Sequence, residues 1–128
     1  MLDTNMVSHL INQNPSVVRR VVAISMASLC ISAITAGELQ FGLAKRPAAA
    51  RLHLAVTELL RRIDVLAWDH TVPIGYGTIR ADLQNRGKTL AAMDLLIATH
   101  ALAIGAVLVT NDRAFRQVAS LDVEDWSA

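Results

Sequence analysis

Short, mainly apolar segments that lack polar alternation restrict the fold of this sequence more than any other feature. Residues 29–32, 64–67 and 106–110 form such segments, and residues 122–126 are a fourth strand candidate. A strand that is apolar on both faces is normally covered on both faces, which is typical of parallel sheets between layers of helices. The sequence therefore predicts an α/β fold with a mainly parallel central sheet.

Longer segments with helical character lie between these strands. Residues 15–27, 47–63, 71–86 and 91–104 are expected to be helices, and Gly87 is placed to end the third of them. Alternating strands and helices predict an α/β/α sandwich. In such folds the functional side chains gather beyond the carboxyl ends of the strands.

The composition narrows the class of protein further. With 128 residues the chain is expected to form a single domain over residues 1–128, and with 53% hydrophobic and 18% charged residues it is not a disordered chain. The high apolar content predicts surface that a partner or a second copy covers. The net charge of +1 gives no bulk attraction to nucleic acid, although a local basic patch is compatible with it.

The N-terminus and the cysteine content indicate a compartment. Met1 is not followed by the basic segment and apolar run of a signal peptide, and the longest uncharged run, Val21 to Gly37, is too polar for a membrane span. The single cysteine, Cys30, provides no disulfide framework and favours a reducing environment. We therefore expect a cytoplasmic protein without a membrane partner.

Four acidic residues stand in sequence contexts that demand an explanation. Asp3 and Asp112 can cap the helices that follow them, but each is also expected at the end of a strand, where α/β sites lie. Glu38 fits a capping box with Thr35, in which each side chain satisfies a backbone amide of the other. Asp94 lies in an apolar helix and needs a capping role, an ion pair or a cation. Each of the four is a candidate site residue with a structural alternative.

Other common catalytic patterns are absent from the sequence. There is no glycine-rich phosphate loop, no dinucleotide-binding pattern and no serine nucleophile elbow. The four histidines lack the spacing of metal ligands, and His100 is expected to be a partly buried histidine with its hydrogen bond satisfied. The acidic residues are therefore the main candidates for chemistry.

Several motifs, in this order along the chain, resemble those of PIN domains and in particular of the VapC toxins. The motifs are Leu2-Asp3-Thr4-Asn5, residues 31–39 (ISAITAGEL), residues 76–81 (YGTIRA), residues 94–101 (DLLIATHA), and Val109-Thr110-Asn111-Asp112 with Phe115. The tail from Leu121 to Trp126 is similar to the L-x-x-E-D-W ending of the same family. The resemblance covers essentially the whole chain, and it implies a PIN-domain fold.

The resemblance also implies a cleft in which four carboxylates meet, with two polar residues in support. The carboxylates are Asp3, Glu38, Asp94 and Asp112, and the supporting residues are Asn5 and Thr110. Two like charges ~4 Å apart repel by ~4 kcal/mol at an effective dielectric of about 20, so such a cleft needs a cation. Oxygen ligands favour Mg²⁺, with Mn²⁺ as the alternative. Five basic residues are candidates to contact RNA phosphates: Arg80, Arg86, Lys88, Arg113 and Arg116.

The function implied by the resemblance is that of the toxin in a type II toxin–antitoxin system. Such a toxin is a Mg²⁺-dependent endoribonuclease that inhibits translation, and the expected target is a tRNA anticodon loop, with initiator tRNA as the first candidate. The implied partners are a VapB-type antitoxin and a second copy of the chain, with DNA reached only through the antitoxin. Two alternatives stay open: a catalytically idle module that joins an antitoxin on operator DNA, and a metal-dependent nuclease that acts on messenger RNA or DNA.

Overall fold

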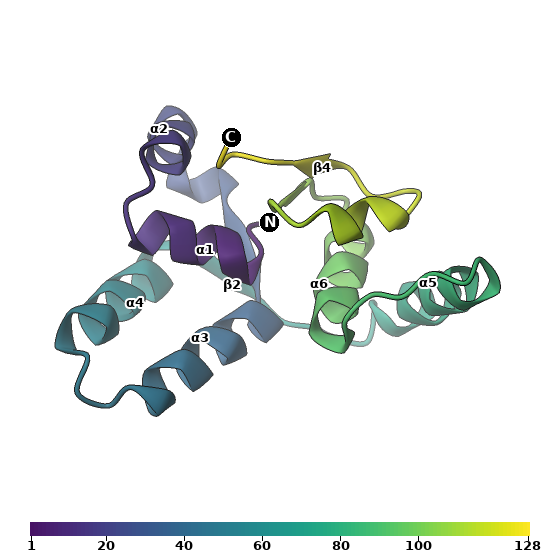
Figure 1. The fold of residues 1–128 in the computed structure, drawn as a ribbon, viewed down its shortest axis with the longest axis horizontal. Helices are drawn as coiled ribbons and strands as arrows, with labels where there is room; N and C mark the ends of the chain where they lie inside the picture. The colour runs from purple at the N-terminus through teal and green to yellow at the C-terminus, as the bar shows by residue number, and fades with distance from the viewer.

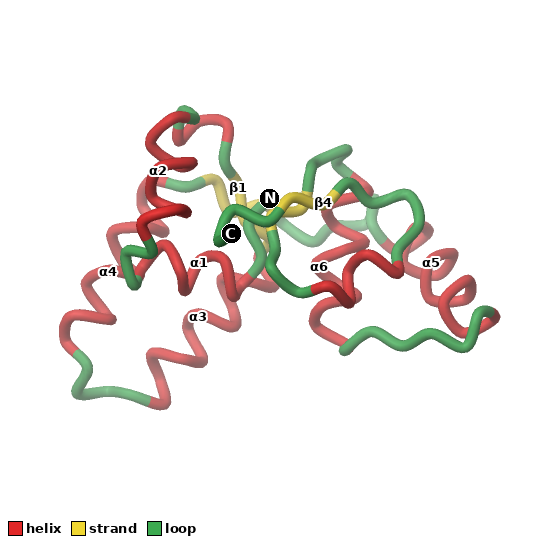
Figure 2. The backbone as a smooth tube through the Cα atoms, turned by 45° about the horizontal axis from the view of Figure 1, so that its top comes forward, coloured by secondary structure: helices red, strands yellow, loops and turns green.

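The computed structural model describes residues 1–128, and very short parallel strands run through its middle (Figure 2). Strand β1 (Cys30–Ser32) pairs in parallel with β2 (Asp64–Leu66), and β3 (Leu108–Val109) pairs in parallel with β4 (Val123–Glu124). The predicted parallel pairing is confirmed. The strands are shorter than expected, and the predicted strand 106–110 keeps only two of its residues.

The first three residues join these two pairs of strands. On one side Leu2 N donates to Cys30 O at 2.9 Å. On the other side Val109 N donates to Met1 O at 2.8 Å, Asp3 N donates to Val109 O at 3.0 Å, and Leu2 forms a parallel bridge to Val109. The spatial order is therefore β2, β1, residues 1–3, β3, β4. Asp3 and the residue after Val109 consequently lie at the same edge of the sheet.

Six α-helices and two 3₁₀ helices surround the strands. In Figure 1, α1 to α4 occupy the left part of the molecule, α6 lies below β4, and α5 extends furthest to the right. The α-helices are α1 (Thr4–Ile11), α2 (Pro15–Ala23), α3 (Ala33–Lys45), α4 (Ala50–Arg62), α5 (Pro73–Asn85) and α6 (Ala92–Ala103), and the 3₁₀ helices are η1 (Met26–Ser28) and η2 (Arg113–Gln117). No helix combines the length and the hydrophobicity that a membrane span requires.

The helix predicted over residues 15–27 is too long at its end. Helix α2 stops at Ala23, because Ile24 is extended and the Ser25 side chain caps the separate 3₁₀ helix η1. A serine that satisfies a nearby backbone amide competes with continued helix, and here it ends the helix.

The helix predicted over residues 47–63 begins only at Ala50, which has no side-chain cap before it. The end of α5 agrees with the prediction. Gly87 has a φ of +64°, in the left-handed region that glycine adopts easily, and Lys88 N closes the turn by donating to Leu83 O at 2.8 Å.

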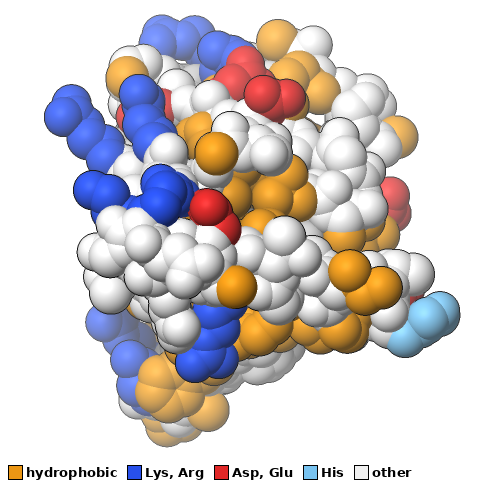
Figure 3. Space-filling view, turned by 90° about the vertical axis from the view of Figure 1, so that its right-hand side faces the viewer, with side chains coloured by type: hydrophobic (Ala, Val, Ile, Leu, Met, Phe, Trp, Pro, Cys, Tyr) orange, Lys and Arg blue, Asp and Glu red, His pale blue; other side chains and the backbone are white.

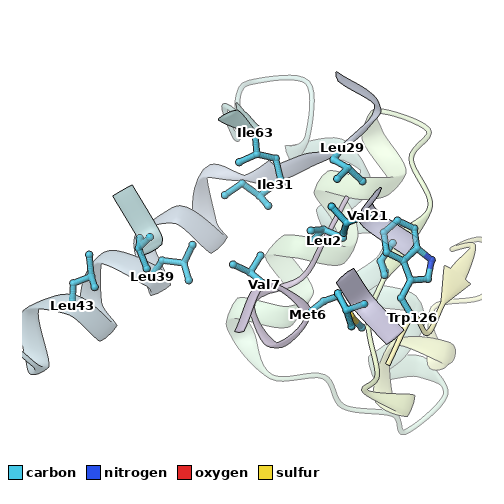
Figure 4. Close-up of a cluster of buried hydrophobic side chains, with 13 residues drawn as sticks. Leu2, Met6, Val7, Val21, Leu29, Ile31, Leu39, Leu43, Ile63 and Trp126 are labelled. Carbon is cyan, nitrogen blue, oxygen red and sulfur yellow. The ribbon is translucent and has the colours of Figure 1, made fainter. Parts of the chain in front are cut away.

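The hydrophobic core has two parts that meet at the N-terminal segment. The larger part joins α1 to α4, and Trp126 from the C-terminal tail packs into it beside Met6 and Val21 (Figure 4). The smaller part joins α6, β3 and η2. Met1 belongs to the smaller part and Leu2 to the larger one, as expected for successive residues of an extended segment, whose side chains point to opposite faces. The N-terminal segment therefore fixes the two halves against each other.

Candidate active site

Asp3 lies at the end of the N-terminal segment and is buried, with 3% of its surface exposed. Its Oδ1 accepts from Met6 N at 2.8 Å and so caps α1, and its Oδ2 accepts from the Thr110 hydroxyl at 2.5 Å. Burial raises the pKa of Asp3, with smaller contributions from the negative charges of Asp112 and Glu38, while the two hydrogen bonds act in the opposite direction. The capping role and the place at a strand end are both observed.

Thr110 connects Asp3 to Asp112. Its buried hydroxyl donates to Asp3 and accepts from Asp112 N at 3.0 Å. Asp112 in turn caps η2, because its Oδ1 accepts from Ala114 N at 2.9 Å. The two strand ends thus carry one continuous hydrogen-bond network that holds two carboxylates at the same edge of the sheet.

Glu38 is held differently from the prediction. Helix α3 begins after Ser32, whose hydroxyl caps it by accepting from Ile34 N at 3.1 Å, so the predicted capping box of Thr35 and Glu38 is wrong. Glu38 lies inside α3, and its Oε1 accepts from the Thr4 hydroxyl at 2.5 Å. The side chain of Glu38 therefore points toward the first residue of α1, which follows Asp3 in the chain. The role of Thr4 was not anticipated, because its partner lies 34 positions away in the sequence.

Asp94 has neither of the structural roles that its sequence context allowed. It lies in the first turn of α6, makes no capping hydrogen bond, and takes part in no ion pair or side-chain hydrogen bond. Burial raises the pKa of Asp94 to about 6, and the negative charges of Asp112, Asp3 and Glu38 add to the shift. The capping and ion-pair explanations are therefore wrong. The shared repulsion shows that the structure brings the four predicted carboxylates into one electrostatic neighbourhood.

The remaining predicted polar residue, Asn5, is exposed on the first turn of α1. Beside Asp112, a hollow of about 90 Å³ is lined in part by Arg113 and Arg116, which are exposed and form no ion pair. Lys88 is likewise exposed and free of an acidic partner. These three cations are available to an anionic ligand.

The other two predicted basic residues, Arg80 and Arg86, are engaged within the chain. Arg86 forms an ion pair with Asp82 at 2.8 Å and donates to Gln117 O at 2.6 Å. Arg80 donates to the Tyr76 hydroxyl at 3.0 Å, which leaves its charge without a counterion. Arg86 is thus a structural tie between α5 and η2, whereas Arg80 keeps its full charge.

His100 is part of the core rather than of the site. It is buried, its Nδ1 lies 2.7 Å from the Ser32 hydroxyl, and burial lowers its pKa. The prediction of a histidine with a satisfied hydrogen bond is confirmed. Its partner, Ser32, is the residue that caps α3, so His100 supports the helix that carries Glu38.

Comparison with known proteins identifies the family. The PIN domain model matches residues 1–121. A crystal structure of DNA-bound VapBC from Salmonella typhimurium contains a chain that superposes with a TM-score of 0.91 at 36% identity, covering 98% of this chain and 96% of that one. VapBC2 from Rickettsia felis, bound to a DNA fragment from its promoter, superposes with a TM-score of 0.90 at 30% identity, covering 98% and 97%. The chain belongs to the PIN-domain family.

The relatives in sequence define the subgroup. The tRNA(fMet)-specific endonuclease VapC of Shigella flexneri is 40% identical over 99% of this chain and 97% of its own length. The tRNA(fMet)-specific endonuclease VapC of Salmonella typhimurium is 38% identical over 98% and 96%. Within the PIN-domain family the chain groups with the VapC ribonucleases, as its motifs predicted.

PIN-domain ribonucleases depend in general on divalent metal ions. The donor set here fits such an ion, because it consists of carboxylate and hydroxyl oxygens and leaves Asp94 charged without a partner. No three acidic, histidine or cysteine side chains lie close enough together to hold one ion directly. That spacing agrees with the usual coordination of Mg²⁺, which keeps several waters and contacts only one or two carboxylates.

Proposed function

We propose that this protein is the toxin of a type II toxin–antitoxin pair and that it acts as a Mg²⁺-dependent endoribonuclease. The proposal places the cut in a tRNA anticodon loop, with initiator tRNA as the first substrate to test, and translation stops as a result. The observation that carries it is the convergence of four carboxylates on an otherwise unpaired Asp94. The Shigella and Salmonella relatives, named as tRNA(fMet)-specific endonucleases, support the choice of RNA.

Each carboxylate has a separate task in this proposal. Asp3 and Asp94 would contact the ion directly, with Mn²⁺ as an acceptable substitute, and Asp112 would complete the shell through a water. Glu38 would bind the ion through water or orient the attacking water. When bound, Mg²⁺ lowers the pKa of a bound water and neutralises charge on the scissile phosphate. The products are a 5′-phosphate and a 3′-hydroxyl.

The chain's own hydrogen bonds prepare these carboxylates. Thr110 holds Asp3 and the backbone of Asp112 at fixed positions, and Thr4 holds Glu38 toward the same edge. Preorganised ligands need no rearrangement when the ion binds. Asn5 is close in sequence to both Asp3 and Thr4, and we assign it a supporting role toward water or substrate.

The apolar surface supports two protein partners. Phe41, Leu54 and Val22 on the α2–α4 side are exposed by 63%, 65% and 78%, and Ile74 on α5 is exposed by 84%. Exposed apolar residues on two separated regions fit a VapB-type antitoxin and a second copy of the chain. DNA is then reached only through the antitoxin, a proposal that the promoter-bound VapBC2 of Rickettsia felis supports. We also propose that the protein works in the cytoplasm. Light scattering on the isolated chain tests the homodimer.

A cleavage assay tests the enzymatic proposal. Antitoxin-free protein is incubated with unfractionated tRNA or with a messenger RNA, in Mg²⁺ or in EDTA. The Asp94→Asn variant is compared with Asp122→Asn, which removes an exposed carboxylate outside the site. We expect one discrete tRNA product that requires both Mg²⁺ and Asp94, and full activity in Asp122→Asn.

The other outcomes separate the alternatives. Cleavage of messenger RNA or DNA, with tRNA intact, keeps the nuclease and changes the substrate. Metal binding without any cleavage supports the idle operator module. Equal cleavage by wild type and Asp94→Asn would remove the assigned site.

A further inference from the structure

Helix α5 is packed loosely for an element of a small domain. Of its residues only Leu83 is buried, and the helix has no side-chain cap at its N-terminus. It packs chiefly against α6, the helix that carries Asp94, and projects away from the sheet (Figure 1). Most side chains of α5 are therefore free to contact a ligand or a partner.

Two aromatic side chains fix the position of a cation on this helix. Trp68 Nε1 donates to Leu96 O at 3.0 Å, on the same helix as Asp94 and close to it. Tyr76 packs edge-on against Trp68, with ring centroids 6.2 Å apart at 78°, and accepts from Arg80 Nη1 at 3.0 Å. A neutral hydroxyl orients the guanidinium without neutralising it, so most of the donors of Arg80 stay free.

Arg80 borders a hollow of about 240 Å³ between the C-terminal half of α5 and the segment that leads into α6. Two cationic side chains, those of Arg80 and Lys88, line the hollow together with the amide of Gln84. The remaining lining is mainly apolar. Its lining includes Ala92 and Leu95, which belong to the same first turn of α6 as Asp94, so the hollow lies against the turn that carries this carboxylate.

The far wall of the hollow is also held in place. Gln117 Nε2 donates to Thr89 O at 3.0 Å, and Arg86 Nη2 donates to Gln117 O at 2.6 Å, so η2 fixes the segment that contains Lys88. The charge of Arg86 is taken by Asp82, whereas no acidic side chain pairs with Arg80 or Lys88. Figure 3 looks onto the α5 and α6 side of the molecule and shows Lys and Arg side chains gathered along one edge of that face, beside an apolar area.

We propose that this hollow is a nucleotide subsite that positions the RNA strand beside Asp94, with Arg80 and Lys88 contacting a backbone phosphate and Tyr76 acting as the positioning residue for Arg80. The proposal rests on the ribonuclease function proposed above and assigns it a substrate-holding surface. Arginine presents several donors to one phosphate, and a charged hydrogen bond is stronger than a neutral one. The volume is below the range of about 300 to 1,000 Å³ for drug-sized ligands, so the hollow suits a single nucleotide unit of a longer strand. An acidic peptide is the alternative occupant, and the test below separates it from RNA.

Salt-dependent RNA binding tests the subsite. Filter binding of unfractionated tRNA is measured at a series of salt concentrations for wild type in Ca²⁺, and for Arg80→Gln, Lys88→Gln and Tyr76→Phe under the same conditions. Arg19→Gln is the matched control, because Arg19 is an exposed helical arginine without an ion pair on α2. Losing one phosphate contact should weaken binding about 10-fold and lower the slope of log K against log salt by about 0.7 to 0.9.

Kinetics separates positioning from catalysis. In Mg²⁺ we expect Arg80→Gln and Lys88→Gln to raise KM for tRNA cleavage with little change in kcat. Tyr76→Phe should raise KM by less, and should add nothing in the Arg80→Gln background, since Tyr76 acts through Arg80.

Three results would overturn the subsite. The first is an unchanged salt slope in Arg80→Gln and Lys88→Gln while wild type binds and cleaves tRNA, which leaves the ribonuclease proposal standing. The second is that Arg80→Gln and Lys88→Gln lose binding to an acidic peptide, measured in parallel as a second probe, while they bind RNA as wild type does. The third is wild-type protein that binds no RNA, in which case the subsite falls together with the proposed function, and Asp94→Asn then shows no defect either.

Discussion

The two sides of the carboxylate site hold their charges in opposite ways. At the strand ends, Asp3 and Asp112 each cap a helix, and Thr110 connects them in one hydrogen-bond network. At the start of α6, Asp94 has no hydrogen bond and no ion pair, and its pKa is raised to about 6. The first region serves stability and site geometry together, whereas the second carries a charge that the folded chain alone does not stabilise.

Because of this difference, substitutions in the two regions give different information about the site. A substitution at the strand ends changes folding and the site at once, so a loss of activity there has two explanations. A substitution of Asp94 removes a destabilising charge, so a loss of activity there is informative about chemistry. Natural proteins often accept such a local cost at functional sites.

The largest effect on stability is expected for Asp3→Ala. The substitution removes the cap of α1, worth about 1 kcal/mol, and leaves the buried Thr110 hydroxyl without its acceptor, at about 1 to 3 kcal/mol. Relief of the buried charge offsets part of this loss. We expect the free energy of unfolding to fall by about 2 to 3 kcal/mol in urea denaturation, together with loss of cleavage.

Asp3→Asn is the matched control, because its side-chain oxygen still accepts from Met6 N. It should lose cleavage but only a part of the stability. Wild-type stability in Asp3→Ala would show that the strand-end network contributes nothing to folding.

The strand-end region was also the easier one to predict from the sequence. Asp3 and Asp112 were identified because they follow strands and precede helices, and the structure confirms both positions. Asp94 was identified because a carboxylate in an apolar helix needs an explanation. In each case a local rule was sufficient, since the neighbouring residues in the chain create the environment.

Features set by contacts between distant segments were not predictable in the same way. Both Ser32 and Thr35 satisfy the local rule for a helix cap, and the end of β1, fixed by its pairing with β2, decides in favour of Ser32. The bond from Thr4 to Glu38 joins residues 34 positions apart, and no local pattern contains it. The spacing of four residues between Asp82 and Arg86 is a local signal for their ion pair. The sequence contains no such signal for the hydrogen bond from Arg86 to Gln117 O.

An intermediate and opposite effect on stability is expected for Asp94→Asn. In the unfolded chain Asp94 titrates near 3.8, and in the folded chain near 6. Below the lower value both states are protonated, and the group contributes nothing to the pH dependence. Between the two values the folded state retains a proton that the unfolded state has released, so the free energy of unfolding falls as the pH rises, and the loss is constant above the upper value.

The shift corresponds to at most about 3 kcal/mol, which partial exposure to solvent reduces to about 1 to 2 kcal/mol. In EDTA at neutral pH, Asp94→Asn should therefore melt higher than wild type by about 4 to 8 °C, and the difference should disappear near pH 4. Adding Mg²⁺ should stabilise wild type and leave the variant unchanged, since a ligand stabilises only the state that binds it. Calorimetry measures all three, and a lower melting temperature in the variant at neutral pH would contradict the contrast between the two regions.

The smallest effect is expected at the link between α1 and α3. Thr4→Val keeps the shape of the side chain but removes the hydroxyl that donates to Glu38. Because Glu38 is only half-buried, water can replace the lost donor, and the stability should change by less than about 1 kcal/mol. The carboxylate is then free to rotate, so kcat for tRNA cleavage should fall about 3- to 10-fold with KM unchanged. This loss is below the loss of about 10- to 100-fold that is typical of residues that orient metal ligands.

Two variants control for this effect. Thr4→Ser restores the donor and should restore kcat, and Thr57→Val, the same change at an exposed position of α4, should have no effect. If Thr4→Val cleaves as fast as wild type, Glu38 needs no orientation by α1, and the preorganisation of the site is confined to the strand ends.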